Sequence, residues 1–264
     1  MCCPSATLAV WCSAWLHGAA ASDDALDALR AWGEAHEVVA ADTGTAEAFD
    51  IPVTGAVPAT PGQLLPALRR LGVSTARLLL PVPGDVRGLG GAGPFGKAAL
   101  RSGEAVLLPE TGYGLVPQAI AEGLVRWTVF GVPGGPEPEY VGLAEAEHGL
   151  TDAIRDSAGA LQALDVASDR PGVRAELSAT LRARPRPDWP SGMPGRALRV
   201  LQRAEEVGAI LALASADEPG GALSASAATR RADALRPLAD AVRTARRAAV
   251  DEAVRAFADQ AAPS

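Results

Sequence analysis

The sequence predicts an α/β fold, in which a small, mixed and largely parallel sheet is covered by helices, followed by an all-α antiparallel helical segment. Before about residue 140, short β-type apolar runs alternate with Gly- and Pro-rich loops. After it, Ala-, Leu- and Arg-rich stretches carry apolar residues at the 3–4 spacing of helices. We therefore expect an α/β domain at 1–140 and a helical bundle segment at 141–264, either separate or packed on the first as one unit.

The first 60 residues predict two helices and one strand. Apolar residues recur at helical spacing over 6–17, and Gly18 provides a stop. Ser22 opens a second helix with two acidic residues in its first turn. The apolar run 37–41 indicates a buried strand, and 42–58 is expected to be a loop.

The middle of the chain predicts a twice-repeated helix–Gly–strand unit. The first unit is a helix at 61–71 and a strand at 77–82, whose two apolar faces are typical of a central strand. The second is a helix at 94–102 and a strand at 104–108. A last strand at 127–130 is expected at an edge or in a hairpin. The repeated unit favours crossover helices and hence parallel strands.

The C-terminal half predicts four helices, at 141–164, 172–183, 196–215 and 224–258. Pro237 lies inside the last of them and is expected to kink or split it, because proline removes a backbone hydrogen bond. Four helices with such connections can close an antiparallel bundle or pack back on the sheet.

The composition points to a cytoplasmic bacterial protein. The three cysteines, Cys2, Cys3 and Cys12, all lie at the N-terminus and cannot form a disulfide framework or a zinc site. The apolar stretch 6–16 is too short to cross a membrane, and no Lys or Arg precedes Arg30 to form a signal peptide. The Ala- and Arg-rich composition is typical of a GC-rich genome.

The charge distribution argues against nucleic-acid binding. The net charge is −7; residues 1–140 hold 8 basic and 14 acidic side chains (−6), and residues 141–264 hold 16 and 17 (−1). Arg243, Arg246 and Arg247 share a face of the last helix, but acidic residues interrupt them at ion-pair spacing. We interpret this stripe as a solvated, salt-bridged face.

A pattern resembling a phosphate loop, G-x-x-x-x-G-K, occupies 91–97. Ala98 replaces the hydroxyl residue that would hold Mg²⁺, and Pro94 lacks one of the required N–H groups. Nucleotide hydrolysis is therefore not expected. A small anion bound at the helix start, near Lys97 and Arg101, remains an alternative.

The best ligand-site candidate follows the strand at 77–82. Ligands in open α/β sheets bind beyond the carboxyl ends of strands, where this chain places Asp85 and Arg87. The competing interpretation is a turn with a capping Asp and a surface ion pair. Together with the anion site above, the candidate ligand-binding residues are Asp85, Arg87, Lys97 and Arg101.

No catalytic residue or metal ligand is nominated. Glu145 and His148 have the spacing used in di-iron bundles, but such sites need a second copy of the motif, so we interpret them as a solvated helix face. With three histidines and no nucleophile elbow, the chain offers little for a catalytic triad. No cofactor is expected.

Three segments have distinctive amino-acid sequences: 15–29, 78–88 and 93–106. Through them the chain resembles a family of uncharacterised conserved proteins from high-GC, actinobacteria-like genomes. The resemblance implies a bacterial cytoplasmic protein of unknown role, and it brings no catalytic residues.

These observations favour a non-catalytic cytoplasmic interaction or regulatory protein, which acts through an unidentified protein partner or through self-association. The alternative is a binding protein or enzyme for a small anionic ligand, with its site at the carboxyl edge of the sheet. Nucleic acid and membrane are not expected as partners.

Overall fold

The computed structural model describes residues 3–85, 88–91, 93–133, 140–163, 172–216 and 225–261. The chain divides into two compact units. We call Cys2–Tyr140, Pro185–Pro194 and Val250–Ser264 the sheet unit, and Val141–Arg184 with Gly195–Ala249 the helical unit. Beyond the sheet-forming region, the sheet unit thus includes the described end of the last helix.

The elements before Tyr140 agree with most of the predicted ones. They are α1 (Pro4–Leu16), α2 (Ser22–Leu29), β1 (Ala35–Ala40), α3 (Thr43–Phe49), α4 (Pro61–Arg70), β2 (Arg77–Leu79), α5 (Pro94–Ser102), β3 (Ala105–Leu108), β4 (Tyr113–Ala121) and β5 (Leu124–Gly131).

The sheet is mixed, as predicted, but the expectation that it is largely parallel was wrong. The strand order is β1-β5-β4-β3-β2, in which only β1 and β5 pair in parallel. The pairs β2–β3, β3–β4 and β4–β5 are antiparallel. The cause is the tight β3–β4–β5 meander and a chain reversal between β2 and β3, so that α5 does not act as a parallel crossover.

Three local expectations also need correction. Helix α3 lies in the expected loop, because Asp42 caps it by accepting a hydrogen bond from the N–H of Thr45 (2.9 Å). No strand was expected where β4 lies. Strand β2 is an edge strand rather than a central one, and it ends before Pro81, which has no N–H for a ladder.

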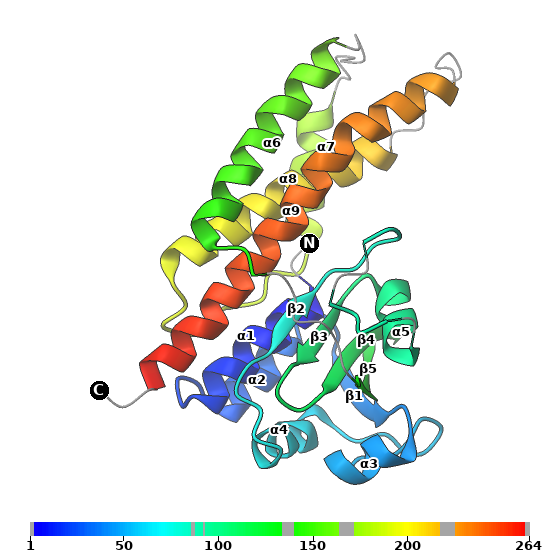
Figure 1. Ribbon diagram of the computed structural model, residues 1–264, viewed down its shortest axis with the longest axis vertical. Coiled ribbons are helices and arrows are strands. Elements are labelled where there is room, and N and C mark those ends of the chain that lie inside the picture. The colour runs from blue at the N-terminus through cyan, green and yellow to red at the C-terminus, as the bar shows by residue number, and fades with distance from the viewer. Residues whose placement is uncertain are drawn as a thin grey trace. The chain divides into compact units, whose positions relative to one another are not determined.

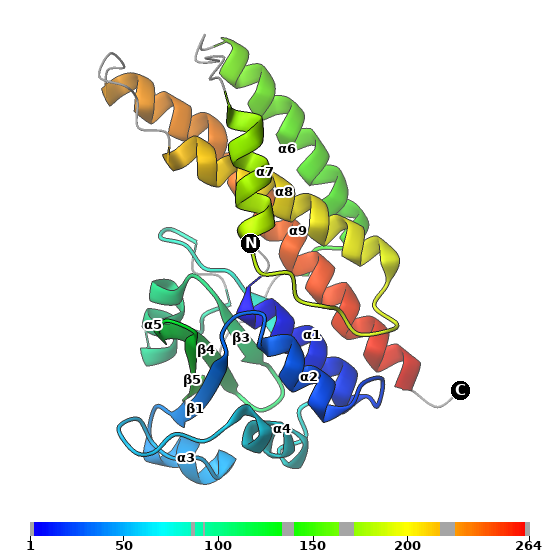
Figure 2. The same ribbon diagram turned by 180° about the vertical axis from the view of Figure 1, so that it is seen from behind.

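Helices cover the two faces of the sheet unequally (Figures 1 and 2). The main core includes buried residues of α1, α2 and α4 together with Val38, Trp127 and Val129 of the sheet. On the other face α5 packs its Phe95 and Ala99 against β2, β3 and β4. A single nine-residue helix covers little of a five-stranded sheet, so part of this face stays open.

The described helices of the C-terminal half are α6 (Leu143–Ala163), α7 (Val173–Ala183), α8 (Gly195–Ala216) and α9 (Ala225–Ala261). Helix α9 continues through Pro237, so the expected split does not occur. Small buried residues such as Ala204 on α8 and Ala245 on α9 allow close helix packing. Among the described residues, no helix combines the length and apolarity needed to cross a membrane.

Candidate functional site

A pocket of about 590 Å³ lies in the sheet unit, between the end of α5, the start of α1 and the hairpin of β4 and β5. We call it the α5 pocket. Its lining residues come from the start of α1, the loop after α2, α5, the short link after α5, and strands β4 and β5; they are Pro4, Trp32, Ala98, Arg101, Ser102, Glu104, Val116, Pro117, Gln118, Ala119, Val125, Thr128 and Phe130. The volume is within the usual range for small-molecule sites.

The end of α5 positions the polar side of the pocket. Ser102 donates a hydrogen bond from Oγ to the carbonyl of Pro117 (2.7 Å), which ties the end of α5 to β4. Gly103 then ends the helix with a φ of 76°, a conformation that favours glycine. Arg101, in the last turn of α5, and Glu104, two residues after its end, both line the pocket.

Glu104 is the most constrained charged group of the pocket. Its Oε2 accepts a hydrogen bond from the backbone N–H of Ser5 (2.8 Å), in the first turn of α1, where a carboxylate is favoured by the helix dipole. Burial raises the pKa of the Glu104 carboxyl above its usual range, and hydrogen bonds from Ser5 and Cys3 oppose that rise. Glu104 is thus a fixed and poorly solvated acid.

The three predicted ligand residues that the structure describes do not line one pocket. Arg101 lines the α5 pocket, whereas Lys97, although on the same helix, is exposed and does not. Asp85 lies in a tight turn where its backbone N–H donates to the carbonyl of Val82 (2.9 Å). Arg87 lies outside the described residues. The sequence-based prediction did not include Glu104. The available signal was its position, since it is a charged residue placed between a helix-ending Gly and an apolar strand.

The glycines of the phosphate-loop pattern have structural reasons. Gly91 has a φ of 103°, and a Cβ on Gly96 would approach the Gly91 carbonyl oxygen to 2.5 Å. Gly96 is thus required by a close backbone approach. This packing accounts for the two glycines without a bound phosphate.

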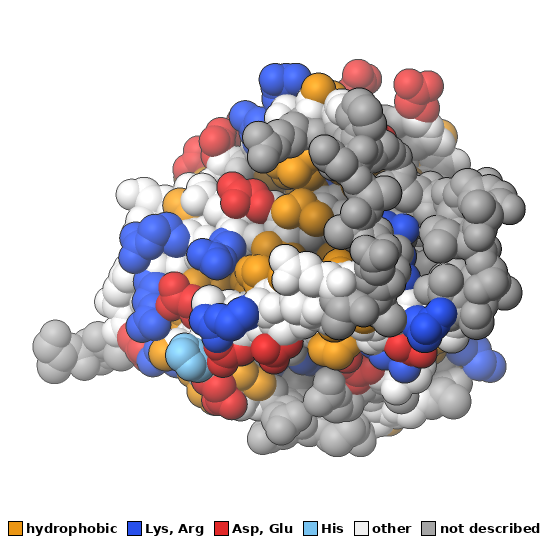
Figure 3. All heavy atoms as spheres, turned by 90° about the horizontal axis from the view of Figure 1, so that it is seen from above, with side chains coloured by type: hydrophobic (Ala, Val, Ile, Leu, Met, Phe, Trp, Pro, Cys, Tyr) orange, Lys and Arg blue, Asp and Glu red, His pale blue; other side chains and the backbone are white. Residues whose placement is uncertain are grey.

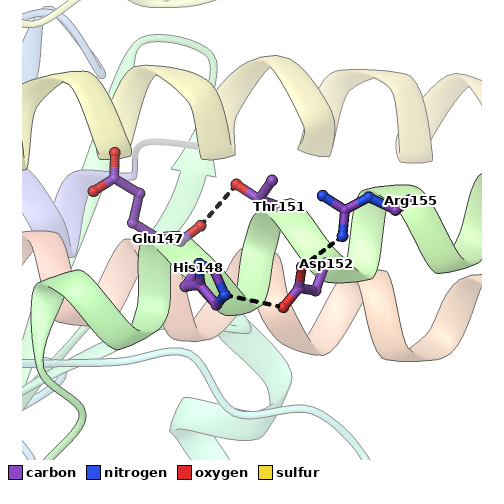
Figure 4. Close-up of polar contacts among 5 residues, drawn as sticks. All are labelled: Glu147, His148, Thr151, Asp152 and Arg155. Carbon is purple, nitrogen blue, oxygen red and sulfur yellow. Dashed lines mark hydrogen bonds and ion pairs between the residues drawn. The ribbon is translucent and has the colours of Figure 1, made fainter.

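Glu145 and His148 lie on α6, where the surroundings are those of a solvated helix face. The His148 imidazole lies 3.5 Å from the carboxylate of Asp152, which also pairs with Arg155 at 2.8 Å (Figure 4). The side chain of His148 is 82% exposed. Among the residues that the structure describes, no three His, Cys, Asp or Glu side chains are grouped as a metal site would require.

Arginines of α9 pair with acidic side chains at several positions. Arg246 contacts Glu205 of α8, and Arg243 contacts Asp240, both at 2.8 Å. On the face shown in Figure 3, basic and acidic side chains are intermixed, with hydrophobic side chains between them. This distribution differs from the continuous basic surface of nucleic-acid-binding proteins.

The cysteine thiols are buried. Cys3 and Cys12 are thiols rather than members of a disulfide, and burial raises the pKa of the Cys12 thiol to about 12. Since the thiolate is the nucleophilic form, Cys12 is a packing residue of α1.

The fold and the pocket define the class of protein: a mixed α/β sheet with a pocket that carries two charged residues, followed in the chain by long helices. The chain belongs to the Rv1486c-like family: the model of the family's N-terminal domain matches residues 5–141, and the model of its C-terminal domain matches residues 144–247. This result confirms the resemblance noted from the sequence.

The relatives are mycobacterial. The chain is 39% identical to the uncharacterized protein Rv1486c of Mycobacterium tuberculosis strain H37Rv, over 95% of this chain and 96% of that protein. It is 35% identical to the uncharacterized protein ML1804 of Mycobacterium leprae, over 95% and 97%. No solved structure matches. The relatives' names state no activity that could be transferred.

Proposed function

We propose that this protein is a non-catalytic interaction protein that acts through a protein partner or through self-association. The supporting observation is the apolar surface of the helical unit. Ile210 of α8 is 50% exposed. Leu211 and Leu213 of the same helix, and Leu177 and Leu181 of α7, are only partly buried. Large aliphatic side chains that remain exposed or half-buried on two packed helices, α7 and α8, favour a contact surface.

Sedimentation velocity over a range of concentrations, together with affinity capture from a mycobacterial lysate, tests this proposal. Ile210→Asp should abolish self-association or the capture of a specific partner. Ala212→Asp adds the same charge at an exposed position about 200° around α8 and is the matched control. The proposal is contradicted if the protein is a monomer and captures no partner whose binding is lost in Ile210→Asp.

We further propose that the protein is cytoplasmic and that its domains divide near residue 140, with the end of α9 from Val250 as part of the sheet unit. The buried thiols of Cys3 and Cys12 support a reducing compartment. Fractionation of mycobacterial cells with an antibody against the protein tests the location, and a periplasmic or secreted signal contradicts it.

A second candidate function is the binding of a small anionic ligand at Asp85, Arg87, Lys97 and Arg101. One observation favours it: Arg101 lines the α5 pocket. A thermal-shift screen against nucleotides and sugar phosphates tests it, since saturating ligand raises stability by mass action. A shift that Lys97→Ala or Asp85→Ala abolishes supports this site, and no shift with any anion contradicts it.

A further inference from the structure

The α5 pocket carries two opposite charges on its walls. Arg101 and Glu104 both line it, and the remaining lining residues are apolar or uncharged. Within the described part of the chain, neither charge has an ion-pair partner. A purely anionic ligand would meet the Glu104 carboxylate, and a purely cationic one would meet the Arg101 guanidinium. The pair therefore favours a ligand with one charge of each sign.

Glu104 favours a cationic group in particular. Its carboxylate is held by the Ser5 N–H at 2.8 Å and is therefore oriented before any ligand arrives. A poorly solvated carboxylate gains more from a nearby ammonium than an exposed one does. Arg101 is exposed, and its flexible side chain can follow an anionic group.

The apolar walls of the pocket favour a ligand that also carries an apolar group. Trp32, Val116 and Phe130 contribute aromatic and aliphatic surface to the pocket. Trp32 is fixed by a hydrogen bond from its Nε1–H to Thr7 Oγ1 (2.9 Å). Rigid apolar surface of this kind suits an aliphatic or aromatic side chain.

We propose that the α5 pocket binds a free α-amino acid with an apolar side chain, whose ammonium faces Glu104 and whose carboxylate faces Arg101. This inference deepens the ligand-binding candidate function and replaces its anionic ligand with a zwitterion. It does not depend on the apolar surface of the helical unit, so sedimentation results on Ile210→Asp leave it unaffected.

The test is a thermal-shift screen of the full chain with the twenty free L-amino acids as probes, followed by calorimetry on those that stabilise it. We expect stabilisation by apolar amino acids such as L-leucine or L-phenylalanine. The N-acetyl derivative, which lacks the ammonium, and the amide, which lacks the carboxylate, should each bind at least about tenfold more weakly. Equal binding of either derivative, or no stabilisation by any of the twenty, overturns the proposal.

Variants locate the site. Arg101→Gln should weaken binding at least about tenfold, whereas Arg70→Gln removes the same charge from an exposed position on α4, outside the pocket, and should leave binding unchanged. Glu104→Gln keeps an acceptor for the Ser5 N–H while removing the charge, and should also weaken binding. Ala98→Phe should block the pocket. Equal effects of Arg101→Gln and Arg70→Gln would place the ligand elsewhere and overturn the assignment.

Discussion

The guanidinium of Arg246 lies 2.8 Å from the carboxylate of Glu205, so that an ion pair joins α9 to α8 inside the helical unit. The two side chains are only 12% and 20% exposed. Gly208 leaves room for the guanidinium, because a Cβ there would lie 2.5 Å from Arg246 Nη2. Burial lowers the pKa of Arg246 to about 10, so the side chain remains a cation at neutral pH.

Removing Arg246 should therefore cost far more than removing an exposed arginine of the same helix. Arg246→Ala leaves a mostly buried Glu205 without this cation, and we expect a loss of about 3 kcal/mol in the free energy of unfolding. Arg236, 71% exposed and paired with Asp233, is the control, and Arg236→Ala should cost less than about 1 kcal/mol. Urea denaturation measures both; equal losses would show that burial does not strengthen the pair.

His36 should make stability depend on pH. Its Nδ1 accepts a hydrogen bond from Trp127 Nε1–H (3.0 Å), so the ring is neutral and its Nε2–H donates to the carbonyl of Leu29 (2.8 Å). Burial lowers the pKa of His36, and the hydrogen bond to Leu29 opposes that shift. The folded state binds this proton less well than the unfolded state does. The contribution of His36 to the free energy of unfolding is therefore fully present above the unfolded pKa of about 6.5, and it is lost as the pH falls below that value.

The change to test is His36→Asn, which keeps an acceptor for Trp127 but cannot titrate. We expect the difference in unfolding free energy between wild type and variant to shrink as pH falls from about 7.5 to about 5.5. Glu104 has a raised pKa and so has the opposite effect on the wild-type curve, but it is common to both proteins and cancels in the difference. A pH-independent difference would contradict the neutral assignment of His36.

Elements with local signals could be predicted from the sequence, whereas strand pairing could not. Helix α5 has the predicted bounds, because Pro94 opens it and Gly103 ends it in a left-handed conformation. The direction of β3 relative to β2 depends on a chain reversal that the helix–strand pattern does not encode. Likewise β1 pairs with β5, which follows it by about 90 residues in the chain, and nothing local specifies that partner.

The candidate site was predictable only in part, for the same reason. Arg101 could be nominated because it lies near the start of a predicted helix, where small anions bind. Glu104 could not, because its orientation depends on Ser5, which is 99 residues away in the sequence. Arg87 lies outside the described residues, and Asp85 and Lys97 remain predictions.

Gly114 lies in β4, a strand that the sequence pattern did not predict. A Cβ at this position would lie 2.4 Å from the ring of Phe95, which α5 buries against the sheet. Gly114→Ala should therefore destabilise the protein by about 1–3 kcal/mol through overpacking.

Gly149→Ala is the matched control, because Gly149 is exposed within α6 and a Cβ there meets nothing within 4 Å. It should stabilise the protein by up to about 1 kcal/mol. Combining Gly114→Ala with Phe95→Leu should recover part of the loss in thermal unfolding. If the two substitutions simply add, the close contact is not the cause.

The end of α9 should be required by the sheet unit. Phe257 is 1% exposed and belongs to the main core with residues of α1, and Ser13 Oγ donates to the carbonyl of Val254 (3.3 Å). Phe257→Ala should cost about 3–5 kcal/mol in the free energy of unfolding, because it opens a cavity in that core.

Gln260→Ala, at an exposed position one turn later, should have little effect. Denaturation followed by tryptophan fluorescence measures both, since Trp11 and Trp15 lie in the same core. Equal stability of the two variants would instead favour a domain boundary at residue 140 with all of α9 assigned to the helical segment.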